Sequence, residues 1–263
     1  MKVSFAKKHW IYLIFTIFIF ENGFADVKDS KPLNTASLSY SKDTFDQGYD
    51  DWDFFSATVS RKFDFGSAAF RVNEANRFGL KGWQYEFDAY PSLRDGTYMY
   101  LNTGFSNSTS LFPKNRFGAE IYQSLPFSWE VSLGFRHLIF ENSVVNIQTA
   151  TVGKYIGNYF LTARVNNIPN STGTSNSFSV QGRKYFGDED YVALSYGSGR
   201  SLSQIGTSED IAALSSRKFG LDSRFEVWPT WILNTGLSYE SEEIRPSAFR
   251  IRKSFSIGID KRF

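Results

Sequence analysis

The chain of 263 residues contains no cysteine and only two histidines. Without cysteine the fold has no disulfide bonds, and zinc–thiolate, haem–thiolate and cysteine-nucleophile chemistry are excluded. No run of 18 apolar residues occurs, so no segment has the length and hydropathy of a membrane-spanning helix. Neither sign of charge dominates, because 29 Lys and Arg face 27 Asp and Glu. The clustered basic surface of a nucleic-acid-binding protein is therefore not indicated.

Aromatic residues, in contrast, are abundant. The chain has 27 Phe, 14 Tyr and 6 Trp, together 18% of all residues. Only 41% of residues are hydrophobic, and the mean hydropathy is −0.31. High aromatic content with modest hydropathy is typical of a transmembrane β-barrel, in which apolar and polar residues alternate and rings gather at the two interfaces.

The N-terminus has the pattern of an export signal. Residues 1–9 are basic, Trp10–Phe20 forms an apolar stretch of 11 residues, and small residues precede a cut before Asp26. We predict a signal peptide over 1–25 and one barrel domain over 26–263; an uncleaved anchor is the alternative. Cleavage removes three lysines and one glutamate, which leaves 26 basic and 26 acidic residues.

Beyond about residue 35 the pattern has a period of two. Trp83, Tyr85 and Phe87 alternate with Gln84, Glu86 and Asp88, and the same pattern recurs along the chain. Successive strand side chains point to opposite faces, so each segment has one apolar and one polar face. The strands of a soluble β-sandwich show the same alternation of apolar and polar residues. Segments of about 10 to 13 residues favour membrane strands, and so do the large charges on the polar face.

We predict an all-β, up-and-down antiparallel transmembrane barrel of fourteen strands, with twelve as the alternative. The strands are expected near 35–42, 52–62, 66–76, 80–90, 96–106, 115–124, 128–140, 143–154, 157–167, 174–186, 189–199, 214–227, 230–241 and 247–263.

The connections agree with this count. Bacterial barrels have short periplasmic turns and longer outer loops. With the N-terminus in the periplasm, the longest connections, near 43–51, 107–114 and 200–213, all lie on the outer side. Three prolines are expected in periplasmic turns, where no ladder hydrogen bond is lost; these are Pro91, Pro126 and Pro229.

The C-terminus alternates up to its last residue. Apolar residues recur at even spacing before the terminal aromatic residue: Phe255, Ile257, Ile259 and Phe263. This pattern resembles the signal read by the outer-membrane assembly machinery, which we expect as a partner. Lys261 departs from the pattern, although a lysine near an interface can extend its amine into water.

Several segments together resemble the YaiO family of outer-membrane β-barrels. The matching stretches, in order, are Tyr85–Pro91, Gly96–Tyr98, Arg116–Pro126, Val152–Tyr159, Arg183–Asp188 and Gly197–Ser201. The resemblance extends from about residue 35 to 263 and implies the fold and a location in the cell outer membrane. It implies no catalytic motif and no biochemical activity.

The polar faces of the strands predict a charged lumen. Both signs are interspersed among the residues expected to point inward: Arg71, Glu86, Asp88, Glu120, Glu130, Arg136, Arg164, Arg183, Asp222, Arg224, Glu226, Arg250, Asp260 and Arg262. Either opposed charges pair along the wall and leave a hydrated pore, or they pair across a narrow lumen and close it. Fourteen strands lie between filled eight-stranded barrels and open sixteen-stranded porins, so both remain open.

A catalytic site is not predicted. After the signal peptide the chain has one histidine, His137, which shares its face with Phe135 and is expected on the lipid side. A hydrolase would need a base beside a lumenal nucleophile. Neither a cofactor nor a metal site is indicated.

The sequence thus predicts a monomeric barrel surrounded by outer-membrane lipid. We expect a narrow channel or transport-associated barrel for small polar solutes or saccharides, gated by the loop near 200–213. The alternative is a structural or surface-interaction barrel with a blocked lumen, which acts through its outer loops. An outer-membrane lipid hydrolase is a third and weaker interpretation.

Overall fold

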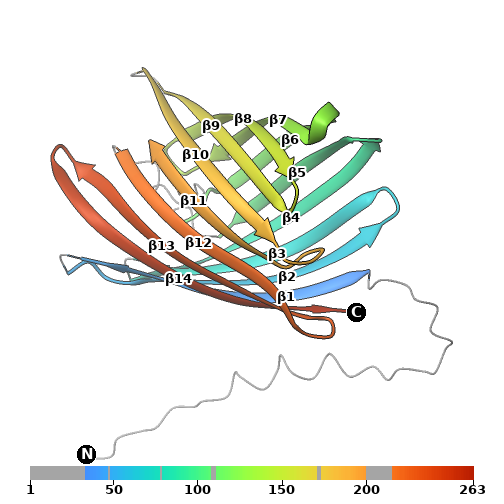
Figure 1. Cartoon of the computed structure of the whole chain (residues 1–263). Helices are drawn as coiled ribbons and strands as arrows, with labels where there is room; N and C mark the ends of the chain where they lie inside the picture. The colour runs from blue at the N-terminus through green and yellow to red at the C-terminus, as the bar shows by residue number, and fades with distance from the viewer. Residues whose placement is uncertain (1–32, 47, 78, 108–110, 171–172, 200–214) are drawn as a thin grey trace, which may run out of the picture. The chain divides into compact units, whose positions relative to one another are not determined.

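The computed structural model describes residues 33–46, 48–77, 79–107, 111–170, 173–199 and 215–263. Its compact unit spans Pro32–Phe263 and contains a closed antiparallel barrel (Figure 1). Each strand pairs with its neighbours in sequence, and β1 closes the barrel against β14. The expected signal peptide over 1–25 and the expected gate near 200–213 lie outside the described residues.

Fourteen strands form the barrel, as the alternation predicts. They are β1 (Asn34–Phe45), β2 (Trp52–Phe63), β3 (Gly66–Arg77), β4 (Leu80–Arg94), β5 (Thr97–Ser106), β6 (Asn115–Leu125), β7 (Trp129–Ile139), β8 (Val144–Ile156), β9 (Tyr159–Asn170), β10 (Gly173–Tyr185), β11 (Tyr191–Gly199), β12 (Ser215–Trp228), β13 (Trp231–Arg245) and β14 (Ala248–Arg262). A short 3-10 turn, η1 (Pro126–Ser128), links β6 to β7. Within the described ranges, no helix has the length and hydropathy needed to cross a membrane.

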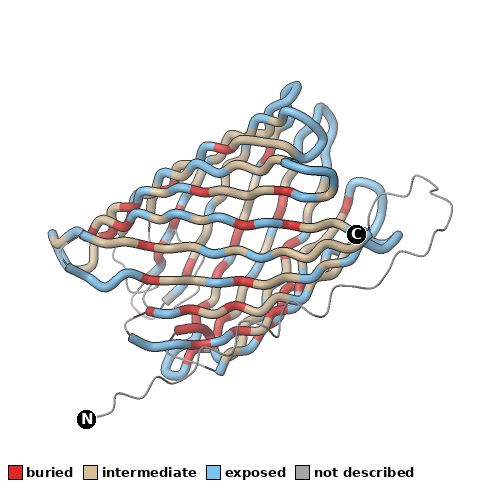
Figure 2. The backbone as a smooth tube through the Cα atoms, turned by 90° about the horizontal axis from the view of Figure 1, so that it is seen from below, coloured by how far each residue is buried: buried red, intermediate tan, exposed pale blue. Residues whose placement is uncertain are grey.

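Burial alternates along the strands in the sense opposite to that of a soluble protein. On β4, Trp83 and Phe87 are exposed, whereas Gln84, Glu86 and Asp88 are buried. Buried and exposed positions follow one another along many strands in Figure 2. The apolar face therefore points outward and the polar face inward. This arrangement is stable where lipid covers the outside.

The seam between the first and last strands is fully paired. The Asn34 amide donates to the Phe263 carbonyl at 2.9 Å, and the Phe263 amide donates to the Asn34 carbonyl at 3.0 Å. Phe255, Ile257 and Ile259 of β14 are exposed on the outer wall. Their recognition by the assembly machinery stays a prediction. We call the end with Asn34 and Phe263 the inner end, and the opposite end the outer end.

Pro91 contradicts one expectation about the turns, because it lies inside β4 opposite Gly66. β4 continues to Arg94 through a bulge after Ser92, and so reaches the start of β5. The predicted strand ended at residue 90, with Pro91 in the turn, whereas β4 extends four residues further. Gly66 makes the close pairing possible: its φ is +142°, and a Cβ there would lie 2.1 Å from the Tyr90 carbonyl oxygen.

Candidate functional site in the barrel lumen

A cavity of about 1250 Å³ lies inside the barrel and is lined by two different walls. On the strands from β10 through β14 to β1 the lining residues are mostly small: Ser39, Ser41, Ser179, Ser195, Gly197, Gly220, Gly236, Ser238, Ser254 and Ser256. The strands from β3 to β9 contribute most of the aromatic rings on strands and many of the charges. Small side chains on one wall leave room for a solute beside the long side chains of the other.

Asp88 and Glu86 anchor the charged wall between β3 and β6. Asp88 is fully buried, pairs with the Arg71 guanidinium at 3.0 Å and accepts a hydrogen bond from the Asn102 amide at 2.7 Å. Glu86 accepts a second bond from Asn102 at 3.0 Å and pairs with Arg116 at 3.3 Å. Each carboxylate thus has neutral donors as well as a cation, which compensates for its desolvation.

Glu120 is the corresponding anchor between β6 and β9. It accepts a hydrogen bond from the Ser132 hydroxyl at 2.6 Å and pairs with Arg164 at 2.9 Å. Arg164 is also fixed by the Thr151 hydroxyl at 3.0 Å. Gly134 faces Glu120 across the ladder, and a Cβ at Gly134 would lie 2.9 Å from the Glu120 Cβ and Cγ. The Glu120 side chain therefore lies flat against a position that has none.

Replacing Gly134 with alanine should consequently disturb this pair. We expect Gly134→Ala to lower the unfolding free energy by about 1–3 kcal/mol, because the added methyl group overpacks against Glu120. Gly118→Ala is the matched control, since a Cβ there meets Arg136 and Asn102 only at 3.5 and 3.7 Å. Urea unfolding of the refolded barrel measures both variants. Equal stability of the two would show that the contact with Glu120 is unimportant.

A second charged cluster lies at the outer end, between β1, β13 and β14. Glu242 pairs with Arg250 at 2.7 Å and with Arg252 at 3.4 Å, and Arg252 donates to Asp43 at 3.0 Å. Both guanidinium groups lie over the Trp52 ring, 5.3 and 5.0 Å from its centroid. These charges are buried against each other and against an aromatic ring, so the cluster fixes the wall where β1 meets β14.

The inner rim holds a third cluster. Arg224 pairs with Asp260 at 2.6 Å and with Glu189, in the connection after β10, at 3.6 Å. Arg262 contacts Glu189 as well and pairs with Glu226 at 3.7 Å. The acidic segment around Glu189 is thereby tied to the barrel wall.

The structure places the predicted lumenal residues in four groups. Six line the cavity: Arg71, Glu86, Glu130, Arg164, Arg183 and Asp222. Asp88 and Glu120 are buried in the same wall behind them, and Arg136 lies beside Gly118. Arg250 belongs to the outer cluster, and the inner rim holds Arg224, Glu226, Asp260 and Arg262. Contact of any of them with a solute stays a prediction.

Several cavity-lining charges escaped the sequence reasoning: Asp43, Arg77, Arg116, Lys218 and Arg252. The signal was present for three of them, because Arg252 shares the parity of Arg250 in β14. Arg116 shares the parity of Glu120 in β6, and Lys218 shares that of Asp222 in β12. Asp43 was expected in a loop, whereas β1 extends through it to Phe45.

Apolar residues inside the outer end were not predicted at all. Leu111 and Phe112, from the β5–β6 connection, are almost fully buried against Ala75, and the Phe112 ring lies 6.3 Å from the inward-facing Phe54 ring. Phe112 also lines the lumenal cavity. Leu111 and Phe112 therefore lie inside the barrel and narrow its outer end. A second apolar cluster occupies the outer ends of β7 to β9, with Leu138, Phe140, Val145, Ile147 and Ile168.

His137 lies outside the lumen. Its Nδ1 is 2.7 Å from the Asn146 side-chain oxygen, and its ring stacks at 6.4 Å on Phe135, whose side chain is exposed on the outer wall. Neither neighbour is a nucleophile. Among the residues that the structure covers, no group of three His, Asp or Glu side chains is arranged to hold a metal ion.

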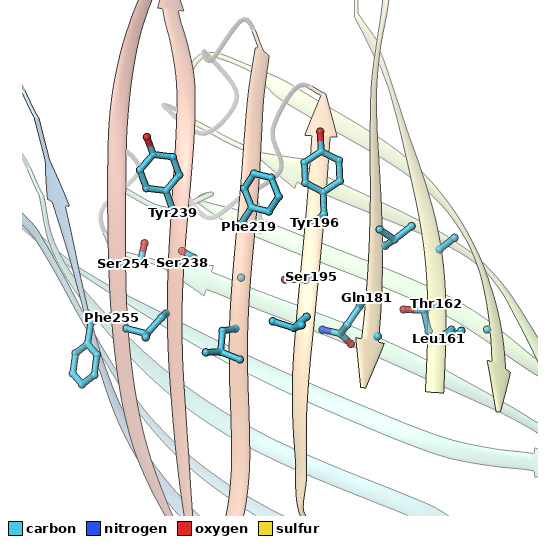
Figure 3. Close-up of a pocket in the computed structure, with 18 of the residues that line it drawn as sticks. Leu161, Thr162, Gln181, Ser195, Tyr196, Phe219, Ser238, Tyr239, Ser254 and Phe255 are labelled. Atoms are coloured by element: carbon cyan, nitrogen blue, oxygen red, sulfur yellow. The ribbon is translucent and has the colours of Figure 1, made fainter. Parts of the chain in front are cut away.

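A second hollow, of about 1440 Å³, lies on the outer wall over β8 to β14 and β1. Figure 3 shows Tyr196, Phe219 and Tyr239 in one row across three neighbouring strands, with Leu161 and Phe255 below them. Its lining consists mainly of outward-facing rings and aliphatic side chains, which belong to the face that lipid covers. Although this hollow is larger, the hydrogen-bonded charges lie in the lumen, and we place the candidate site there.

A closed barrel with an apolar outside and a charged lumen defines the class of outer-membrane β-barrels. Residues 33–204 match the model of the YaiO membrane beta barrel domain. The match spans more than half of the chain, which therefore belongs to the YaiO family and to the outer membrane, and the resemblance noted in the sequence is confirmed.

Solved structures agree with the fold at very low identity. A bacterial polysaccharide outer membrane secretin matches with a TM-score of 0.55 at 7% identity, over 89% of this chain and 100% of its own. The outer membrane protein Omp33 of Acinetobacter baumannii matches with 0.54 at 10%, over 89% and 99%. The CymD monoaromatic hydrocarbon channel matches with 0.54 at 6%, over 89% of each chain. No curated protein sequence matches the chain. At such identities the likeness supports the fold alone.

Proposed function

We propose that this barrel is a narrow channel for small polar solutes, including saccharides. The observation that carries the proposal is the cavity of about 1250 Å³ inside the barrel, lined by hydrogen-bonding and charged groups. Water and polar solutes enter such a space without the desolvation penalty that an apolar interior would impose. The polarity of the lining thus supports transport over a purely structural role.

The direction of the ion pairs supports an open lumen. The lumenal pairs run along the wall, between neighbouring strands or strands a few places apart, as in Arg116–Glu86 and Arg164–Glu120. Pairs along the wall satisfy the charges without bridging the cavity. Of the two arrangements that the sequence left open, the one that leaves a hydrated pore is favoured.

Stacked aromatic rings near the inner end support saccharides among the solutes. Tyr98 and Tyr122 stack at 4.6 Å with an angle of 4° between their planes, and Tyr155 stacks on Phe160 at 4.1 Å. Tyr98, Tyr122 and Phe160 line the cavity. Flat rings beside hydroxyl groups suit the apolar face and the hydroxyls of a sugar.

The second candidate is a blocked barrel that acts through its outer loops. It is favoured by Leu111 and Phe112, which are buried within the outer end. The two functions differ in one measurable property, because a blocked barrel conducts no ions whereas a channel does.

Single-channel recording of the refolded chain (residues 26–263) in a planar bilayer tests the proposal. We expect stable, stepwise conductance. Arg164→Glu should shift the reversal potential toward cation permeability, since Arg164 lines the cavity and a carboxylate would reverse its charge. A folded barrel that never conducts would support the blocked scaffold. A conducting Arg164→Glu barrel with the reversal potential of the parent would refute the lumenal role of Arg164.

A further inference from the structure

The basic and acidic partners of the lumenal ion pairs are not equally accessible. The Arg71 side chain is 34% exposed but its partner Asp88 only 1%, and Arg164 is 28% exposed but Glu120 only 4%. On the opposite wall Lys218 is 31% exposed and Glu240 only 3%. Short carboxylate side chains stay at the wall, where neighbours hydrogen-bond them, while long basic side chains extend into the cavity.

The lining of the cavity is accordingly more basic than the barrel as a whole. Seven basic residues line it, Arg71, Arg77, Arg116, Arg164, Arg183, Lys218 and Arg252, against four acidic residues, Asp43, Glu86, Glu130 and Asp222. Of the acids, Asp43 and Glu86 pair with arginines. A narrow lumen with low-dielectric walls focuses the field of the charges nearest to it. A solute in the cavity therefore meets a positive surface.

Arg183 adds a cation with no carboxylate beside it. Its guanidinium donates to the Tyr185 hydroxyl at 3.0 Å and to Gln181 at 3.3 Å, and it lies 4.3 Å from the centre of the Tyr191 ring. No acidic side chain described in the structure pairs with it within 4.0 Å. Neutral contacts hold the group in place and leave its charge available to a ligand. Asp222 also lines the cavity and lies level with Arg183 two strands away, across Ala193.

We propose that the lumen selects anions and binds sugar-sized carboxylates, a proposal that rests on the channel function and names its solute class. Arg183 and the arginines of the charged wall would take the carboxylate, because a guanidinium group binds it with paired hydrogen bonds. The serine hydroxyls of the opposite wall match the hydroxyls of a sugar ring. Glu130 and Asp222 face the same cavity and disfavour a second negative charge near them.

The decisive variant removes one ion pair without changing net charge. In Arg164→Gln/Glu120→Gln, the exposed cation and the buried anion are both neutralised, so no buried charge is left unpaired. We expect a parent barrel that prefers chloride over potassium, and a severalfold loss of that preference in the double variant. Lys81→Gln/Glu74→Gln is the matched control, because this 2.7 Å pair lies on the outer wall. The control should keep the selectivity of the parent.

The results separate this proposal from the channel function. A conducting barrel without anion preference, or a double variant with unchanged selectivity, would overturn the anion-selective lumen and leave the channel intact. A silent barrel would remove the channel, and calorimetric titration of the folded protein with glucuronate, with glucose as reference, would then decide. Glucuronate binding that weakens at least tenfold in Arg183→Gln would uphold the site. Equal affinity for glucose and glucuronate would refute it.

Discussion

Glu242→Ala should be among the most destabilising single substitutions in the barrel wall, with an expected loss of about 3–5 kcal/mol of unfolding free energy. Glu242 pairs with both Arg250 and Arg252, and all three side chains are less than 10% exposed. Arg252 keeps Asp43 as a partner, but Arg250 would lose the carboxylate that both its Nε and its terminal nitrogen contact. A buried guanidinium without a counter-charge accounts for most of the cost.

Glu189→Ala is the matched control for this substitution. Glu189 also joins two arginines, Arg224 and Arg262, but its side chain is 46% exposed. Both arginines keep a second partner, Asp260 for Arg224 and Glu226 for Arg262. Solvent screens such a pair, so we expect a loss of less than about 1 kcal/mol.

Urea unfolding of both variants in detergent, followed by tryptophan fluorescence, measures the contrast. A double variant, Glu242→Leu/Arg250→Leu, should recover most of the stability that Glu242→Ala loses. It also removes the buried Arg250 guanidinium, which Glu242→Ala would leave without a counter-charge. Equal and small losses for Glu242→Ala and Glu189→Ala would contradict the importance of burial at the outer cluster.

The barrel itself could be predicted because its rule is local. Alternation decides which face of a strand meets lipid, and a slip by one residue would turn every side chain to the wrong face. The predicted strands near 52–62 and 66–76 accordingly differ from β2 and β3 by a single residue at their C-terminal ends. The predicted strand ends were wrong where polar residues continue a strand, as at Asp43 in β1.

The organisation of the lumen could be predicted only in part. Parity identifies Glu120 and Arg164 as inward-facing, but they are 44 residues apart, and their pairing depends on the curvature and stagger of the closed wall. The alternation of residues also does not predict that Asp88 lies behind Arg71. That arrangement depends on the lengths of the two side chains and on the hydrogen bonds that Asn102 and Tyr100 donate to Asp88. The sequence therefore indicates a charged lumen without indicating which sign faces the solute.

Leu111 and Phe112 were missed for a related reason. They belong to a connection, where no periodicity specifies direction, and their burial depends on the apolar contacts offered by Ala75 and Phe54. In a lumen that is otherwise polar, these contacts are the physical reason for Leu111 and Phe112 to lie inside the barrel. Their position gives the barrel a constriction that can be removed without altering a strand.

Removing this constriction should increase conductance. In Leu111→Ser/Phe112→Ser, the apolar contacts and the bulk of both side chains are lost from the outer end, and we expect the conductance to rise roughly twofold or more, since pore diameter limits ion flow. Each substitution should cost about 2–5 kcal/mol, as for other large-to-small changes at buried Leu and Phe, while the fourteen strands stay paired. Planar-bilayer recording measures the change.

Phe127→Ser provides the control, because Phe127 is 86% exposed in the turn at the inner end and contributes no constriction. This variant should conduct as the parent does. If the parent is silent and the Leu111/Phe112 variant conducts, the β5–β6 connection closes the barrel and the blocked-lumen function gains support. If both conduct equally, Phe112 does not limit the pore, and the narrowest point lies deeper, among the arginines of the charged wall.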